Sequence, residues 1–154
     1  MSESTSLLSE GPFAGREAFA QLIRDALQQA SIQGWRKMVW CDANFEDWPL
    51  HEKTVFDSLQ AWAQSGRQLV MLARTFDYVQ KHQARMVNWR TTWGHIVECR
   101  VNQHLDASDF PSVLWTPQWA MQRLEMEHST GHAGTEPQRR IRLQEQLQEL
   151  QKQS

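Results

Sequence analysis

The sequence has little cysteine, no excess of positive charge and no long apolar run, and each shortage excludes a class of protein. Cys41 and Cys99 are the two cysteines among 154 residues and lie far apart, so neither a CxxC redox motif nor a disulfide framework is present. No run of about 18 apolar residues exists, so no membrane-spanning helix is predicted. Residues 1–12 carry only the apolar pair Leu7-Leu8 and do not resemble a signal peptide. A flexible N-terminal tail over 1–12 and a cytoplasmic protein are therefore expected.

The charge balance argues against a strongly basic nucleic-acid-binding protein. The formal net charge is -2 and the sequence pI is about 6.3, so nucleic acid is an unlikely partner. Basic residues do gather in one predicted helix, which also carries Trp89 and Trp93. Such a helix can contact a nucleic-acid backbone. The favoured interpretation is that these tryptophans, like most of the eight in the chain, belong to the core.

Residues 15–101 alternate between helix-like and strand-like apolar patterns. Strands that alternate with helices predict an α/β fold with a mostly parallel sheet flanked by helices, as one domain over residues 13–154. Glu98 and Arg100 alternate with apolar residues in the last of these strands, which favours an edge or half-covered position. Helices are expected over 15–34, 48–65 and 76–93, and strands over 38–41, 69–73 and 96–101.

The rhythm changes after Val101. Residues 112–126 predict two extended segments with a turn at Thr116-Pro117, and residues 127–137 predict a loop. A glutamine-rich helix from Pro137 closes the chain. Its narrow apolar stripe can dock either on the chain's own sheet or on another chain; it consists of Leu143, Leu147 and Leu150.

The stretch "MVWCDANFEDWPL" (residues 38–50) places two acidic residues where a strand gives way to a helix. Asp47 precedes Trp48-Pro49 and is predicted to cap the helix. Asp42 ends the strand at the sheet edge where ligands of open parallel sheets bind. The predicted binding residues at this edge are Asp42, Asn44, Arg74, Arg100 and Asn102.

Two interpretations of this set remain open. The arginine pair can hold a phosphate or carboxylate ligand, or Asp42 can pair with Arg74 and tie two loops together. The second is favoured because the sequence shows no nucleophile with a neighbouring base. No catalytic residue, metal or cofactor is predicted, since the spacing of Asp42, Asp47 and His51 fits no coordination pattern. Cys99 is expected to be a buried structural thiol.

The order "MVWCDANFEDWPL … SGRQLVMLA … HIVECR … DFPSVLWTPQWAMQRL" resembles the phospholipase D-like fold. It is similar to an uncharacterised family of small bacterial proteins assigned to that fold, over roughly residues 14–150. Active members of the superfamily carry His-x-Lys-x-x-x-x-Asp, in which the histidine attacks phosphorus and the lysine neutralises charge. The corresponding positions here are Ser112, Leu114 and Trp119, none of which can perform those steps.

A near match to the motif, His51, Lys53 and Asp57, falls in a predicted helix. There His51 and Lys53 lie about 200° apart and cannot converge on one phosphate. The expectation is therefore a non-catalytic binding or scaffold protein on a phospholipase D-like fold. The alternatives are a phosphoryl-transfer enzyme with a divergent site and a nucleic-acid-associated factor. The resemblance also implies a homodimer, and an anionic small molecule or a protein is the other partner considered.

Overall fold

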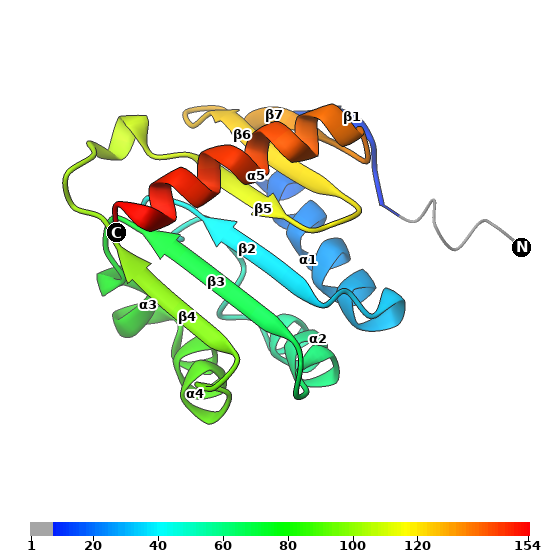
Figure 1. The fold of residues 1–154 in the computed structure, drawn as a ribbon, viewed down its shortest axis with the longest axis vertical. Coiled ribbons are helices and arrows are strands. Elements are labelled where there is room, and N and C mark those ends of the chain that lie inside the picture. Colours follow the sequence, from blue (N-terminus) through cyan, green and yellow to red (C-terminus); the bar gives the residue numbers. More distant parts are fainter. Residues whose placement is uncertain (1–7) are drawn as a thin grey trace, which may run out of the picture.

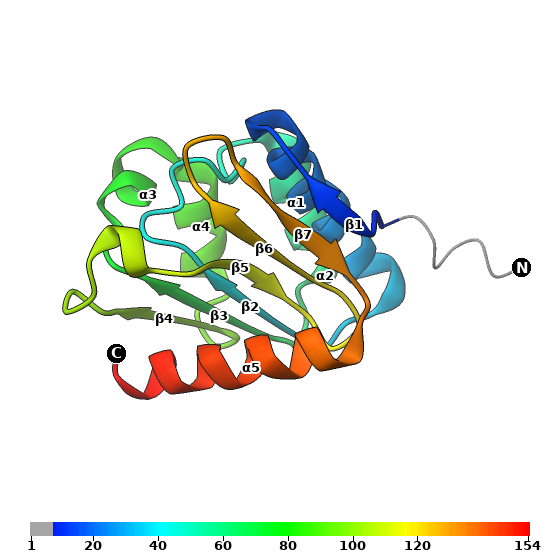
Figure 2. The same cartoon turned by 90° about the horizontal axis from the view of Figure 1, so that it is seen from above.

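The computed structural model describes residues 8–154 and contains a seven-stranded mixed sheet in the order β1-β7-β6-β5-β2-β3-β4 (Figure 1). Helices α1 to α4 cover one face, and α5 crosses the other face alone (Figure 2). The fold class is therefore α/β with a C-terminal helix. In chain order the elements are β1 (Gly11–Phe13), α1 (Arg16–Gln33), β2 (Lys37–Cys41), α2 (Lys53–Trp62), β3 (Gln68–Ala73), α3 (Asp77–His82), α4 (Ala84–Thr92), β4 (Val97–Val101), the short 3-10 helix η2 (Ala107–Asp109), β5 (Ser112–Trp115), β6 (Ala120–Glu125), β7 (Thr130–Gly134) and α5 (Pro137–Lys152).

The sheet joins a parallel half to an antiparallel half, so the prediction of a mostly parallel sheet was wrong. β2, β3 and β4 are parallel, as the strand–helix alternation predicted. β5 pairs antiparallel with β2, and β6, β7 and β1 continue in the same manner. The predicted turn at Thr116-Pro117 does connect β5 to β6, which are two adjacent antiparallel strands.

The larger core lies between the sheet and helices α1 to α4. The predicted inner residues of α1, among them Phe19 and Ile23, are buried in this core. Seven of the eight tryptophans are buried, and Trp93 packs partly against this core. The interpretation of tryptophan as core is confirmed for this chain, and the aromatic residues of the described chain form no exposed stacking platform.

The second core lies under α5. Leu143, Leu147 and Leu150 are buried against the other face of β2, β3 and β5. Of the two possibilities for this narrow stripe, docking on its own sheet is the one observed. The Nε1–H of Trp115 also donates to the carbonyl of Arg140, 2.9 Å away, which fastens the start of the helix to β5.

The predicted helix over 76–93 is two helices that meet at Gln83. The Gln83 side chain is buried, and its amide nitrogen lies 3.1 Å from the carbonyl oxygen of Phe45 and 3.3 Å from that of Trp48. The residue is therefore drawn out of helical geometry to satisfy backbone acceptors of the loop that follows β2.

Asp47 does not cap a helix, so that prediction was also wrong. α2 begins at Lys53 with Glu52 before it, well after Asp47. The Asp47 carboxylate instead accepts a hydrogen bond from Arg123 over 2.8 Å and lies 3.5 Å from Arg16. Asp47, which the local sequence pattern predicted as a helix cap, therefore forms a tertiary ion pair instead.

Residues 127–137, predicted as a loop, contain strand β7. Close backbone approach explains how these residues join the sheet, because a Cβ at Gly131 would lie 2.0 Å from the carbonyl oxygen of Gln122. β1 begins within the predicted tail, at Gly11, and pairs with β7. Residues 1–7 of that tail lie outside the described residues.

β4 forms one edge of the sheet, which agrees with the alternation of Glu98 and Arg100. Its Cys99 is exposed, however, and the expectation of a buried thiol was wrong, because the edge position leaves the outer side of the strand uncovered. Among the described helices, none has the length and apolar composition needed to cross a bilayer.

Candidate functional site

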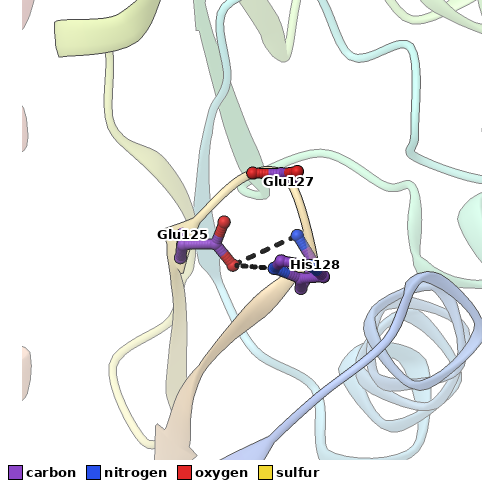
Figure 3. Close-up of side chains that lie close together, drawn as sticks. All are labelled: Glu125, Glu127 and His128. Carbon is purple, nitrogen blue, oxygen red and sulfur yellow. Dashed lines mark hydrogen bonds and ion pairs between the residues drawn. The ribbon is translucent and has the colours of Figure 1, made fainter.

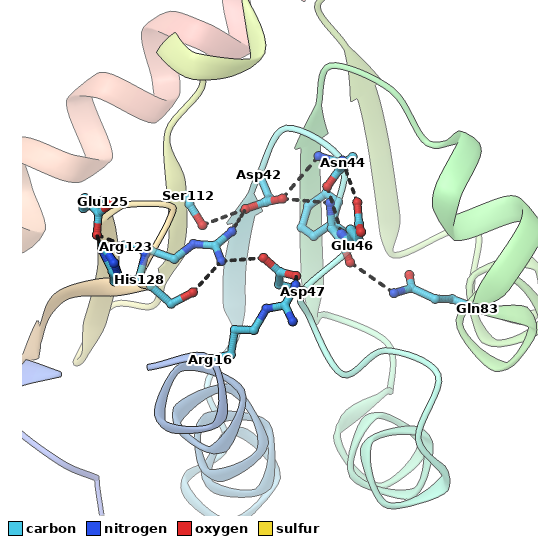
Figure 4. Close-up of polar contacts among 12 residues, drawn as sticks. Arg16, Asp42, Asn44, Glu46, Asp47, Gln83, Ser112, Arg123, Glu125 and His128 are labelled. Carbon is cyan, nitrogen blue, oxygen red and sulfur yellow. Dashed lines mark hydrogen bonds and ion pairs between the residues drawn. The ribbon is translucent and has the colours of Figure 1, made fainter. Parts of the chain in front are cut away.

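A buried ion-pair cluster lies at the carboxyl end of β2 (Figure 4). It joins Asp42, which follows β2, to Ser112 at the start of β5 and Arg123 on β6. β5 runs antiparallel to β2, so the beginning of β5 lies beside the end of β2 and brings Ser112 to this edge. All three residues are buried, and the Asp42 and Arg123 side chains are each 1% exposed.

Four donors surround the Asp42 carboxylate. Oδ1 accepts from the Ser112 hydroxyl over 2.7 Å and from Arg123 over 3.1 Å. Oδ2 accepts from the backbone N–H of Phe45 over 2.8 Å and of Asn44 over 3.2 Å. The tight turn that supplies these N–H groups holds Phe45 at φ 61°, a left-handed conformation uncommon for a bulky residue. The turn therefore keeps the buried Asp42 carboxylate hydrogen-bonded inside the protein.

The guanidinium of Arg123 bridges two acids. Besides Asp42, it donates to Asp47 over 2.8 Å and to the Ser129 hydroxyl over 3.2 Å. It stacks over the Phe19 ring, with 4.2 Å between the guanidinium carbon and the ring centroid. Its Nε–H has no hydrogen-bond partner among the described residues. Ser129, at φ 52°, is the second non-glycine residue with positive φ in the described chain.

Apart from the Arg123 Nε–H, the buried polar groups of the cluster are bonded within the protein and leave little for a substrate. A serine beside a carboxylate has the composition of an activated nucleophile, but Ser112 is 1% exposed. A hollow of about 320 Å³ lies nearby, lined by Arg16, Glu17, Ala20, Glu46, Asp47 and Tyr78. None of Asp42, Ser112 and Arg123 lines it, and Asp47, the second acid bridged by Arg123, does. The chemistry that the arrangement supports is internal charge neutralisation.

The five predicted binding residues do not form one site. Asn44 lies beside Asp42, and its side-chain oxygen accepts from the N–H of Glu46 over 2.9 Å. Arg74 donates to the carbonyl oxygen of Leu105 over 2.9 Å and is not the ion-pair partner of Asp42. The sequence favoured an ion pair between Asp42 and Arg74. In the structure Asp42 does form an ion pair, but its partner is Arg123.

The other two predicted residues lie at the end of β4. Arg100 pairs with Glu98 and donates to the Ser154 carbonyl, on the α5 side of the sheet. Asn102 is buried, and its side-chain oxygen accepts from the N–H of His104 over 2.9 Å. Arg100 and Arg74 therefore have separate hydrogen-bond partners.

The positions that correspond to the catalytic motif are all closed. Ser112 belongs to the cluster, while Leu114 and Trp119 are buried in the core, 0% and 1% exposed. In the near match, Lys53 pairs with Asp57 over 2.9 Å along the surface of α2, and His51 is exposed before that helix.

Glu125, Glu127 and His128 form a group of metal-capable side chains in the turn between β6 and β7 (Figure 3). All three are exposed, and one oxygen of Glu125 accepts from both the backbone N–H and the ring Nδ1 of His128, 3.1 and 3.2 Å away. These bonds fasten the turn. Asp42, Asp47 and His51 form no such group in the described chain.

Arg123 and Ser129 were missed by sequence reasoning. The one available signal was an arginine within the apolar segment "WAMQRLEM", since a charged residue on a buried strand needs a partner. The ion-pair partners of Arg123 could not be predicted from this segment, because Asp42 and Asp47 lie 81 and 76 positions away in the sequence.

No protein-family model matches this sequence, and no curated protein matches it. Solved structures share the fold, among them the two that follow. An archaeal chromatin protein, TrmBL2, described with a novel mode of DNA binding, matches 94% of this chain and 52% of its own with a TM-score of 0.66 and 12% identity. Polyphosphate kinase from Porphyromonas gingivalis matches 95% of this chain and 26% of its own with a TM-score of 0.64 and 9% identity.

The chain thus spans about half of the first protein and a quarter of the second. At these identities the likeness concerns the fold alone. Through the kinase it carries the phospholipase D-like resemblance that the order of elements indicated. The chain is an α/β domain with a distant phospholipase D-like resemblance.

Proposed function

We propose that the chain is a non-catalytic binding or scaffold domain on a phospholipase D-like fold. One observation carries the proposal: the position that corresponds to the attacking histidine is Ser112, whose hydroxyl donates to buried Asp42 over 2.7 Å. A nucleophile must reach the substrate, and this hydroxyl is covered. The charge that would assist phosphoryl transfer is also engaged elsewhere, because Arg123 neutralises Asp42 and Asp47.

The test is hydrolysis of bis(4-nitrophenyl) phosphate, a small substrate with an activated leaving group. The wild type is expected to release nitrophenolate no faster than buffer. Ser112→Ala and Asp42→Asn should match it. Turnover that survives purification and disappears in Ser112→Ala would overturn the proposal, provided that circular dichroism shows the variant to be folded.

A second readout concerns anion binding. The Arg123 guanidinium faces two carboxylates, and Arg74 and Arg100 have separate partners. Inorganic phosphate should therefore leave the melting temperature unchanged at constant ionic strength, since only a ligand that binds the native state raises it. A saturable increase that is lost in Arg74→Ala would favour the divergent phosphoryl-transfer alternative.

Nucleic-acid association is the second candidate, favoured by the fold shared with a DNA-binding chromatin protein. The basic residues Lys81, His82 and Arg85 of α3 and α4 are exposed, whereas the tryptophan of the same stretch, Trp89, is buried. Binding would then rest on phosphate contacts and would weaken steeply with salt. The net charge of -2 opposes it.

Fluorescence anisotropy with a labelled DNA duplex over a salt series tests this candidate. Its support would be salt-dependent binding that falls in Lys81→Glu/Arg85→Glu and persists in Arg142→Glu, an exposed site on α5. Absence of binding at low salt would eliminate it.

A further inference from the structure

The two edges of the sheet differ in how they are protected. β1, at one edge, has three residues and contains Pro12, two features that discourage further strand pairing. β4, at the other edge, has five residues, "VECRV", in regular register with β3. Among the described strands, β4 pairs with β3 alone (Figure 1). Its sequence contains no proline or lysine that would blunt the edge.

The backbone groups that face outward from β4 can be identified from its ends. The Leu69 N–H donates to the carbonyl of Ile96, and the Asn102 N–H donates to the carbonyl of Ala73, each over 2.9 Å. Residues 96 and 102 therefore face β3, and the direction alternates along a strand. It follows that Val97, Cys99 and Val101 direct their N–H and C=O groups to the open edge.

We propose that this edge pairs antiparallel with β4 of a second copy of the chain, around a twofold axis at Cys99. The result is one continuous sheet through two molecules, an isologous interface. In this register Cys99 faces Cys99 of the second copy, and Val97 faces its Val101. Each of these three residues then faces a residue of the second copy whose N–H and C=O groups also point toward the interface.

Charge selects this register. Glu98 lies directly opposite Arg100 of the second copy, and Arg100 opposite its Glu98, so both cross-strand pairs are of opposite sign. A shift that keeps the hydrogen-bond pattern moves the pairing by two residues. One direction then sets Glu98 against Glu98, and the other sets Arg100 against Arg100. The strand sequence is thus self-complementary in one register only.

The side chains are already placed for this pairing. Glu98 and Arg100 contact each other on the α5 face of the sheet and are 36% and 43% exposed. Gln151 and the Ser154 carbonyl hold them there, 3.3 and 3.2 Å away. On the opposite face Val101 is 43% exposed, so the second copy would cover an apolar side chain. The inference does not depend on the proposed absence of catalysis.

Light scattering after size exclusion tests the oligomeric state. The wild type is expected at twice the chain mass of 18.0 kDa. Glu98→Arg and Arg100→Glu each convert both cross-strand pairs to like charge, and each should weaken dimerisation by about tenfold or more. Both variants should keep the wild-type circular dichroism spectrum, since β4 retains its pairing with β3.

Mixing the two variants separates this interface from the ion pair within one chain. In a mixed dimer, the arginines of the Glu98→Arg chain face the glutamates of the Arg100→Glu chain at both cross-strand pairs, so the mixture should regain the dimer mass. A mere contact within the chain cannot be restored by mixing.

Cross-linking gives an independent readout of the register. Mild oxidation of the wild type should link two chains by a disulfide between their Cys99 residues. The Cα atoms of directly opposite residues in a hydrogen-bonded antiparallel pair lie about 5.5 Å apart, a distance that suits a disulfide. Cys99→Ser should abolish this link.

Three results would overturn the inference. The first is a wild type that remains monomeric over the whole accessible concentration range, which would leave the edge to another partner or to none. The second is a dimer unaffected by Glu98→Arg and Arg100→Glu. The third is a mixture of the two variants that stays monomeric.

Discussion

Arg123 and Asp42 form a 3.1 Å ion pair in which both side chains are 1% exposed, although they lie 81 positions apart in the sequence. The pair connects the antiparallel half of the sheet to the end of its parallel half. Each charge is compensated inside the protein, so the loss of either one would leave the other buried and unpaired, away from water.

Arg123→Met should lower the free energy of unfolding by about 3–5 kcal/mol, because the buried Asp42 carboxylate then loses its counter-charge. Urea denaturation followed by tryptophan fluorescence measures this. Arg16→Met is the control, since Arg16 is 78% exposed in its contact with Asp47, and its effect should stay below about 1 kcal/mol. The double variant Arg123→Met/Asp42→Asn should lose less than the sum of its single variants. Full additivity would contradict the coupling.

Gly131→Ala should destabilise the protein by more than about 2 kcal/mol. The added Cβ would meet backbone, 2.0 Å from the Gln122 oxygen and 2.8 Å from the Arg123 Cα, and backbone cannot move aside cheaply. Gly134→Ala is the matched control on the same strand, because its nearest contact is the flexible Glu10 side chain at 3.4 Å. Equal melting temperatures for the two variants would refute the close approach of β6 and β7.

Acid should remove a contribution from the Arg24–Glu52 pair, which joins α1 to the residue before α2 over 2.8 Å. Its hydrogen bond to Arg24 holds the pKa of Glu52 below the usual value. A depressed folded-state pKa adds stability that is present above the unfolded pKa, about 4.3, and is lost as pH falls through the folded value.

Glu52→Gln should therefore lower the melting temperature at neutral pH by about 2–4 °C, for a contribution of about 1 kcal/mol. The difference from wild type should shrink toward a pH of about 3, below the usual glutamate pKa. Glu145→Gln, an exposed change on α5, provides the control. A Glu52→Gln deficit that is constant from neutral to acid pH would exclude the pair as its cause.

Cys41 should resist thiol reagents in the folded protein. Burial, and secondarily the neighbouring Asp42, raise the pKa of this thiol well above its usual value, and the thiolate is the reactive form. In Cys99→Ser, 5,5′-dithiobis(2-nitrobenzoic acid) should react only after denaturant is added. Rapid reaction of that variant without denaturant would show that the end of β2 opens to solvent.

The parallel half of the fold could be predicted from the sequence because its signals are local. Residues 38–41 and 69–73 are apolar runs bounded by glycine or polar loops, and both became buried strands. Short strands with weak patterns could not be predicted. β7 reads "TGHAG" and is strand because Gly131 permits close packing against β6, a fact that only the neighbouring strand reveals.

The candidate site was half predictable for the same reason. Asp42 was placed correctly at the carboxyl end of β2 by the strand-to-loop transition. Asp47 was assigned to a helix cap because Trp48-Pro49 follow it, yet the helix starts later and Arg123 takes its carboxylate. A local motif cannot predict an ion pair with a residue that is distant in the sequence.

The position of α5 as the last described element also has a consequence for folding during synthesis. During synthesis the N-terminal part of a chain can fold first, so the face formed by Val39, Val70 and Leu72 emerges well before Leu143, Leu147 and Leu150. β1 likewise waits for β7, since Gly11 pairs with Ala133. On the ribosome the nascent domain therefore passes through a stage in which one apolar side of its sheet is open, and this is the stage at which a chaperone would find a binding surface.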